Sequence, residues 1–382
     1  MKIRKFLVLA GEESGLIYAE RLKDALQDAQ PDAVMEFRGY QSEGFKTADL
    51  AVMGFWPVLK RLFFFLGVAR TMKRLIREWQ PEAVVTVDYP GLNLKLAAYA
   101  KARGIPAVHV VCPQVWAWHQ GRIPKVAAAI TKLLCFFPFE PPLFNGTDLD
   151  AKFIGHPLVD VFAGEGHTTA RLTEREGRSS ARPQIAILPG SRIGEIQRIL
   201  PRLLAALRLL DGKVEGGFEV LIPAANDKAY AEIKRQVGDN PPPASCHIEI
   251  IRGRARDVLR QADCAAVASG TATLEAALAR CPTVLVYAVS PLLAWFARRV
   301  IKGVRHIGLA NVIAEKTGTP PPMPELLQEA FTPEAVANQL SAWLADADAR
   351  ENAIAALDAA MDHLKSDGDA IGNAAREVLS CV

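Results

Sequence analysis

Residues 184–195 read Gln-Ile-Ala-Ile-Leu-Pro-Gly-Ser-Arg-Ile-Gly-Glu, an apolar run that ends in a Pro-Gly turn and enters a helix-like segment. The run 184–188 predicts a buried strand, and 195–210 predicts the helix after it. The same succession occurs near the N-terminus, where 6–10 is followed by a glycine turn and a helix over 17–27. Strand, glycine turn and helix in this order form the unit from which parallel α/β sheets are built.

The alternation of strands and helices continues around both segments. We predict further strands at 83–87, 107–111, 133–137, 152–154, 219–222, 264–268 and 283–287, and helices at 92–102 and 273–279. The predicted fold is therefore α/β, with two doubly wound, Rossmann-like domains over 1–163 and 184–332. The polar stretch 164–183 is the expected linker, and 333–382 is a helical tail that we expect to pack back on the first domain.

Composition limits the function classes. Of 382 residues, 50% are hydrophobic and 23% are charged, as in globular proteins. A formal net charge of +3 gives no reason to expect a nucleic-acid partner. No apolar stretch is long enough for a signal peptide or a membrane span, so we expect a protein that is soluble or lies on a membrane surface.

The cysteines are scattered, without a C-x-x-C pair, which predicts buried thiols in a reducing compartment and neither zinc site nor disulfide. They are Cys112, Cys135, Cys246, Cys264, Cys281 and Cys381.

Two strand-to-helix turns in the second half have the residues of a phosphate-binding turn. Pro189-Gly190-Ser191-Arg192 lets backbone N–H groups approach an anion, and Arg192 adds a charged donor. Ser269-Gly270-Thr271 follows the strand at 264–268, with Glu275 one helical turn further on, where a carboxylate suits ribose hydroxyls. A solvated surface turn and a simple helix cap are the alternatives. The presence of two such turns favours a nucleotide site.

Polar segments also follow three strands of the first half, at the edge where parallel sheets bind ligands. They are Gly11-Glu12-Glu13-Ser14-Gly15, Asp88-Tyr89-Pro90-Gly91-Leu92-Asn93 and Pro113-Gln114-Val115-Trp116-Ala117-Trp118. The two tryptophans are either packing residues or a cleft wall, and their position outside any periodic face favours the wall. No G-x-G-x-x-G or Walker motif occurs, and both D-x-D sequences lie in polar, helix-flanking segments, so we expect neither cofactor nor metal.

Taken together, these segments resemble lipid-A-disaccharide synthase. The resemblance extends through most of the chain and also includes Phe137-Pro138-Phe139-Glu140, Phe153-Ile154-Gly155-His156-Pro157, Leu188-Pro189-Gly190-Ser191-Arg192, Tyr287, Ser290-Pro291, Asn311 and Pro324-Glu325-Leu326-Leu327-Gln328. It implies a GT-B fold, in which two Rossmann-like domains face a cleft.

The resemblance implies an inverting transfer from UDP-2,3-diacylglucosamine to 2,3-diacylglucosamine 1-phosphate, giving a β-1,6 disaccharide 1-phosphate and UDP. The expected partners are this UDP-linked donor, the acylated glucosamine 1-phosphate acceptor, and the cytosolic surface of the inner membrane, to which the chain binds peripherally from the cytoplasm. A homodimer is a further expected assembly.

The first domain is the expected acceptor side and the second the donor side. Expected donor contacts are Gly190, Ser191, Arg192, Ser269, Gly270, Thr271, Glu275, Tyr287, Asn311 and Gln328. Expected acceptor contacts are Ser14, Asn93, Gln114, Trp116 and Trp118.

The general base does not transfer from the family by matching motifs. The family usually has aspartate where this chain has Leu16, and it reads D-x-P-D-F-N where this chain has Gly91 at the second aspartate. Asp88 is therefore the expected base, with Glu12 and Glu13 as alternatives. A role for Asp88 as a helix cap stays open.

Membrane contact is expected where aromatic residues adjoin basic ones. The stretch 55–66 contains Phe63, Phe64 and Phe65, and Arg70, Lys73, Arg74 and Arg77 follow it. A second candidate is 292–302, and a buried helix with a charged edge is the alternative for both. Two further functions stay open: transfer of another lipid-linked or nucleotide sugar, and a catalytically silent homologue that binds UDP-sugar or lipid.

Overall fold

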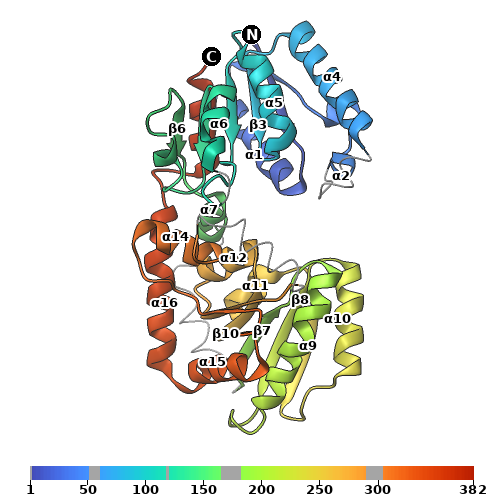
Figure 1. Cartoon of the computed structure of the whole chain (residues 1–382), viewed down its shortest axis with the longest axis vertical. Helices are drawn as coiled ribbons and strands as arrows, with labels where there is room; N and C mark the ends of the chain where they lie inside the picture. The colour runs from blue at the N-terminus through green and yellow to red at the C-terminus, as the bar shows by residue number, and fades with distance from the viewer. Residues whose placement is uncertain (1, 51–60, 118–119, 165–181, 290–303) are drawn as a thin grey trace. The chain divides into compact units, whose positions relative to one another are not determined.

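The computed structural model of the chain describes residues 2–50, 61–117, 120–164, 182–289 and 304–382. These residues form two compact units (Figure 1), one of Met1–Pro157 with Leu364–Val382 and one of Leu158–His363. Each unit has a parallel sheet of its own, with helices on both faces. The predicted α/β fold of two doubly wound sheets is confirmed.

In the described part of the first unit, six parallel strands follow the order β2-β1-β3-β4-β5-β6. They are β1 (Lys2–Ala10), β2 (Ala33–Arg38), β3 (Ala83–Val87), β4 (Ala107–Val110), β5 (Lys132–Cys135) and β6 (Asp150–Phe153). The helices are α1 (Glu13–Ala29), α2 (Thr47–Leu50), α4 (Leu62–Trp79), α5 (Pro90–Lys101), α6 (Ile123–Ala129) and α17 (Ala370–Leu379), with short 3-10 turns at Gln41–Glu43, Gln120–Arg122 and Pro141–Phe144.

Alternating residues of β1 face opposite layers, as the pleat of a strand requires. Phe6 and Val8 pack in the core that contains α1 and α17, whereas Leu7 and Leu9 pack in the core that contains α4. Because the strands of this sheet are apolar on both faces, helices must cover both sides.

The described part of the second unit also has six parallel strands, in the order β12-β11-β10-β7-β8-β9. They are β7 (Gln184–Leu188), β8 (Phe218–Ala224), β9 (Cys246–Arg252), β10 (Cys264–Ala268), β11 (Thr283–Tyr287) and β12 (Glu325–Leu327). The helices are α7 (Pro157–Gly164), α9 (Ile193–Leu209), α10 (Asp227–Asp239), α11 (Ala255–Gln261), α12 (Thr271–Leu278), α14 (Leu309–Thr317), α15 (Pro333–Ala345) and α16 (Ala347–Met361), followed by a 3-10 turn at Asp362–Leu364.

The C-terminal helices belong to both units. Helix α15 packs on α9 within the second unit, whereas α17 packs on α1 within the first. Lys132 of β5 fixes α17, because its Nζ lies 2.6 Å from the Glu377 carboxylate and 2.9 Å from Ser380 Oγ. The last 19 residues therefore complete the core of the first unit.

Candidate active site

Strand ends and turns of the second unit surround a cavity of about 470 Å³. Residues 190–192 line it after β7, and residues 269–272 line it after β10. The ends of β8 and β9 contribute residues 223–225 and 253–255. Both turns expected from the sequence to bind phosphate thus meet at one cavity, at the carboxyl ends of the strands where α/β sheets bind ligands.

Glycine is required in both turns by backbone geometry. Gly190 has a φ of 107° and Gly270 a φ of 146°. Residues other than glycine rarely adopt these backbone conformations. A Cβ on Gly190 would also lie 3.0 Å from Glu195 Cβ. Helices α9 and α12 begin directly after these turns, so their first N–H groups and positive dipole ends are placed for an anion.

The charged groups of this cavity suit a nucleotide. Arg192 is exposed, and its Nη1 lies 3.0 Å from Glu195 Oε1. Burial raises the pKa of Glu275, which lines the cavity from the second turn of α12, while the charge of Arg256 acts in the opposite direction. The cavity therefore offers N–H groups and a guanidinium for phosphate, and a carboxylate for hydroxyl groups.

Three other residues expected to bind the donor, Tyr287, Asn311 and Gln328, are not among those that line this cavity in the described part of the chain. Asn311 is fully buried, and its Nδ2 donates to Met323 O and to Glu325 Oε1, both at 2.8 Å. Gln328 accepts from the Val289 N–H at 3.4 Å, and its own N–H donates to Tyr287 O. In this structure Asn311 joins α14 to β12, and Gln328 joins the ends of β11 and β12.

Glu12, Asp88 and Tyr89 come together at the ends of β1 and β3. Asp88 and Tyr89 have φ values of 49° and 52°, a left-handed conformation that costs energy in residues other than glycine and often marks a functional site. Gly11 makes room for this turn, because a Cβ there would overlap the Tyr89 ring. The Tyr89 hydroxyl donates to Leu50 O at 2.9 Å.

The Asn93 side chain holds the turn at Asp88 in place through hydrogen bonds. Its Nδ2 lies 3.1 Å from Leu9 O, 3.2 Å from Val87 O and 2.7 Å from Asp88 O. Its Oδ1 accepts from the buried Tyr40 hydroxyl at 2.7 Å. Asn93 is fully buried, so its side chain fixes the Asp88 turn and is not open to the acceptor, contrary to its expected role.

Both carboxyl groups of this cluster have a raised pKa. Burial raises the pKa of Glu12, and the charge of Asp88 raises it further. Burial also raises the pKa of Asp88, an effect that the hydrogen bond from the Tyr89 N–H to Asp88 Oδ1, at 2.7 Å, partly offsets. A carboxylate with a raised pKa accepts a proton more readily than an ordinary surface aspartate.

The remaining acceptor residues differ in exposure. Ser14 and Gln114 are exposed, at the start of α1 and in the turn after β4. Trp116 is 5% exposed; its Nε1 donates to Glu140 Oε1 at 3.1 Å, and its ring packs edge-on against Phe139. Trp116 therefore packs between the turns after β4 and β5, and its expected place in a cleft wall stays a prediction. Trp118 lies outside the described residues.

Helix α4 carries the first stretch expected to bind a membrane. Phe63 is 87% exposed, and Leu62 and Leu66 are also exposed, whereas Phe64 and Phe65 pack against the core of the first unit. The basic residues Arg70, Lys73, Arg74 and Arg77 are exposed along the same helix. The stretches 55–60 and 292–302 lie outside the described residues. Within the residues that the structure describes, no helix is long and apolar enough to cross a bilayer.

Two features of the sites were not among the residues expected from the sequence. Gly253 and Arg254 line the 470 Å³ cavity, and both have positive φ. The signal that could have found them is the Arg-Gly-Arg sequence after the alternating run 246–251. Tyr89 lies in the segment 88–93 that the sequence places at the ligand-binding edge, but it was not itself expected to be a site residue.

Two Rossmann-like units, each with a parallel six-stranded sheet, and a cavity between glycine turns in the second unit are the features of the GT-B class of glycosyltransferases. Solved structures agree on the fold. MurG of Acinetobacter baumannii superposes with a TM-score of 0.59 at 14% identity, covering 100% of both chains. The calicheamicin glycosyltransferase CalG4 gives a TM-score of 0.56 at 16% identity, covering 100% of this chain and 98% of that one.

The family follows from the sequence comparisons. A family model described as lipid-A-disaccharide synthetase matches residues 6–376. Lipid-A-disaccharide synthase of Syntrophus aciditrophicus is 35% identical over 96% of this chain and 94% of its own. That of Dechloromonas aromatica is 33% identical over 99% and 98%. The chain belongs to the lipid-A-disaccharide synthetase family, and it is an enzyme that forms the lipid A disaccharide by glycosyl transfer.

Proposed function

We propose that this enzyme transfers 2,3-diacylglucosamine from its UDP derivative to the 6-hydroxyl of 2,3-diacylglucosamine 1-phosphate, with inversion. The acceptor oxygen forms a bond to the donor anomeric carbon as the bond from that carbon to UDP breaks. The acceptor proton passes to a carboxylate, and the electron pair of the broken bond leaves with UDP. The products are a β-1,6 disaccharide 1-phosphate and UDP.

The observation that carries this proposal is the 470 Å³ cavity between the turns at Gly190 and Gly270. A UDP leaving group develops negative charge, which N–H groups and a cationic side chain stabilise. Arg192 and the starts of α9 and α12 supply these groups, and Glu275 suits the ribose hydroxyls. Ser191, Ser269 and Thr271 contribute backbone or hydroxyl donors. Because these groups bear the charge, the transfer requires no metal.

Asp88 is the proposed general base, with Glu12 beside it. The left-handed turn, Asn93 and Gly11 fix the Asp88 carboxyl at the carboxyl ends of the strands. Ser14 and Gln114 are the proposed acceptor contacts, because both are exposed at this edge. Asn93 and Trp116 are positioning residues. Tyr287, Asn311 and Gln328 shape the donor side through β11, β12 and α14.

The exposed face of α4 is the proposed contact with the cytosolic surface of the inner membrane. Phe63 and Leu66 are the apolar anchors, and Arg70, Lys73 and Arg74 face anionic headgroups. This position brings a soluble active site to lipid-linked substrates.

A second candidate function is transfer of a different lipid-linked sugar, and one observation favours it: Gly91 replaces the aspartate usual in the family. The experiment incubates purified enzyme with UDP-2,3-diacylglucosamine, each of several acylated sugar acceptors, and EDTA. We expect UDP and disaccharide only with the diacylglucosamine 1-phosphate acceptor. Product with another acceptor alone would favour the second function, and UDP binding without product would indicate a silent homologue.

A further inference from the structure

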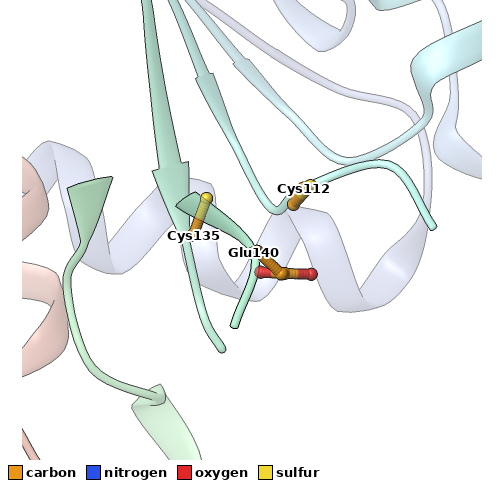
Figure 2. Close-up of side chains that lie close together, drawn as sticks. All are labelled: Cys112, Cys135 and Glu140. Atoms are coloured by element: carbon orange, nitrogen blue, oxygen red, sulfur yellow. The ribbon is translucent and has the colours of Figure 1, made fainter. Parts of the chain in front are cut away.

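Three side chains that commonly bind metals converge at the ends of two neighbouring strands. Cys135 is the last residue of β5, Cys112 follows β4, and Glu140 lies in the turn after β5 (Figure 2). One donor atom of each lies within 4.8 Å of the other two. Thiolate sulfur and carboxylate oxygen are both zinc ligands.

The pairing of β4 with β5 explains this convergence. The strands are parallel and adjacent, with Val110 opposite Leu134, and the Val111 N–H continues the ladder to Leu134 O at 3.0 Å. Val111 then has a φ of 76°, an outlier for a β-branched residue. The strand ends there, and the next residue is Cys112.

All three side chains of the cluster are buried, including the carboxyl group of Glu140. Cys112, Cys135 and Glu140 are 3%, 0% and 2% exposed. Within the described residues, Glu140 has no ion pair with a cationic side chain; its oxygens accept from Trp116 Nε1 and from the Phe137 N–H, both at 3.1 Å. A buried carboxyl group without a cationic partner needs either a proton or a metal ion. Burial raises the pKa of Glu140 to about 8, and the hydrogen bonds from Phe137 and Trp116 act in the opposite direction.

The distances fit a zinc-sized ion after a small adjustment. The three donor atoms lie within 4.8 Å of one another, and the centre of an equilateral triangle of that largest size is about 2.8 Å from each corner. Zinc–sulfur bonds are ~2.3 Å and zinc–oxygen bonds ~2.0–2.2 Å, so side-chain movements of roughly 0.5–0.8 Å close a triangle of that size around the ion. Two sulfurs and one oxygen favour zinc over magnesium or calcium. The N–H groups of Trp116 and Phe137 then orient the carboxylate, as outer hydrogen bonds commonly do for metal ligands.

We propose that Cys112, Cys135 and Glu140 form a structural site for a thiophilic divalent cation of the zinc class. Binding forms two metal–sulfur bonds and one metal–oxygen bond and releases three protons, two from the thiols and one from the carboxyl group. The Pro113 carbonyl oxygen, which accepts from Cys112 Sγ at 3.3 Å, is a candidate fourth ligand. The ion ties the ends of β4 and β5 together and fixes the turn that carries Gln114 and Trp116.

The test uses the full chain after dialysis against a chelator. Cadmium is added in steps, and the ultraviolet thiolate-to-cadmium charge-transfer band is recorded; Tm is then measured with and without zinc. We expect a band that saturates at one equivalent and a zinc-dependent rise in Tm. Cys112→Ser and Cys135→Ser should each weaken cadmium binding at least tenfold, and Glu140→Gln should weaken it less.

Cys264→Ser is the matched control, because Cys264 is equally buried but lies on β10 of the second unit. It should leave the band and the zinc effect unchanged. Wild-type protein without a one-equivalent band, and without a zinc effect on Tm, would overturn the proposal, as would a band that persists in both cysteine variants. Either result would mean that Glu140 is protonated and that the three side chains contribute packing without binding a metal ion. The assay does not depend on the transferase activity.

Discussion

Gly91 lies in the first turn of α5, and among the described residues no atom beyond its chain neighbours and the helix backbone lies within 4 Å of a Cβ built on it. An aspartate therefore fits at this position without disturbing the fold, and a negative charge near a helix N-terminus is favourable. The carboxylate that this chain lacks relative to its family can thus be restored three residues from Asp88.

We predict that adding Gly91→Asp to Asp88→Asn raises kcat at least tenfold above that of Asp88→Asn alone. The reason is that the new carboxylate lies in the first turn of α5, the helix that follows Asp88. The measurement is kcat for UDP release in the single and double variants. Gly91→Asn is the matched control and should restore nothing. Equal rates for the Asp and Asn double variants would show that a base at position 91 cannot replace Asp88.

His109 predicts a pH dependence of stability. It is fully buried on β4, its Nδ1 lies 2.7 Å from Thr86 Oγ1, and burial lowers its pKa from 6.5 to about 3. The unfolded chain therefore binds a proton between pH 6.5 and 3 that the folded chain does not, so the free energy of unfolding falls as pH falls through this window. The slope from this residue is about 1.4 kcal/mol per pH unit.

Urea unfolding at pH 7, 6 and 5 measures this slope. His109→Asn keeps a partner for Thr86 and removes the titrating ring, so it should flatten the dependence while leaving His156, whose pKa is also lowered, in place. An identical slope in wild type and variant would contradict the assignment.

The sequence predicted the glycine turns and the burial of five of the six cysteines, but it did not predict the burial of Asn93 and Trp116 or the convergence of Cys112 with Cys135. A glycine after a buried strand signals a turn by itself, because only the local backbone decides it. Whether Trp116 faces solvent depends on Glu140 and Phe139, which reach it from the next strand. Cys112 and Cys135 lack a zinc-site spacing, and only the pairing of β4 with β5 brings them together.

Secondary structure elements also differ in how well the sequence predicts them, because buried central strands have a clearer pattern than edge strands. Central strands such as β3 and β10 are buried on both faces, so their continuous apolar runs were predicted within a residue. The strands β2, β9 and β12 were missed, and all three lie at sheet edges. Their residues are only partly buried, so the sequence alternates and lacks an apolar run.

The turn between β7 and α9 allows a direct test of donor binding. Gly190→Ala introduces a side chain at a left-handed φ and places its Cβ against Glu195. We predict about tenfold weaker UDP binding by calorimetry, equivalent to ~1.4 kcal/mol. Gly212→Ala is the matched control, because Gly212 also has a positive φ but lies in a loop with open space around it. Equal losses in both variants would indicate general strain instead of a site effect.

Helix α4 refines the membrane prediction, because only part of its aromatic cluster faces solvent. Phe63→Ser with Leu66→Ser should weaken binding to anionic vesicles at least tenfold, since each buried apolar side chain contributes ~1.5–3 kcal/mol. Sedimentation with vesicles measures the effect. Ile17→Ser, at an exposed apolar residue of α1, is the control. Undiminished sedimentation of the α4 variant would exclude this face as the anchor.

At the scale of the whole molecule, the chain crosses from the second unit to complete the first. Ile371, Ala374, Ala375 and Val378 of α17 lie in the same core as β1 and α1. Deleting 364–382 exposes this core, so we predict a lower urea midpoint for the first unit. UDP binding should persist, because the 470 Å³ cavity lies wholly within Leu158–His363.

Deleting only 380–382, beyond the end of α17, is the matched control and should leave the midpoint nearly unchanged. An unaltered midpoint in the longer deletion would show that α17 contributes little to the first unit. Loss of UDP binding in that deletion would show that the two units do not fold independently.

The most direct test of the central claim is the rate of UDP release from UDP-2,3-diacylglucosamine with diacylglucosamine 1-phosphate and EDTA, for wild type and Asp88→Asn. UDP affinity is measured alongside for both. We predict metal-independent turnover in the wild type, a fall of at least 100-fold in kcat for Asp88→Asn, and unchanged UDP affinity. Full activity in Asp88→Asn would contradict Asp88 as the base, and absence of turnover in folded, UDP-binding wild type would contradict the proposed reaction itself.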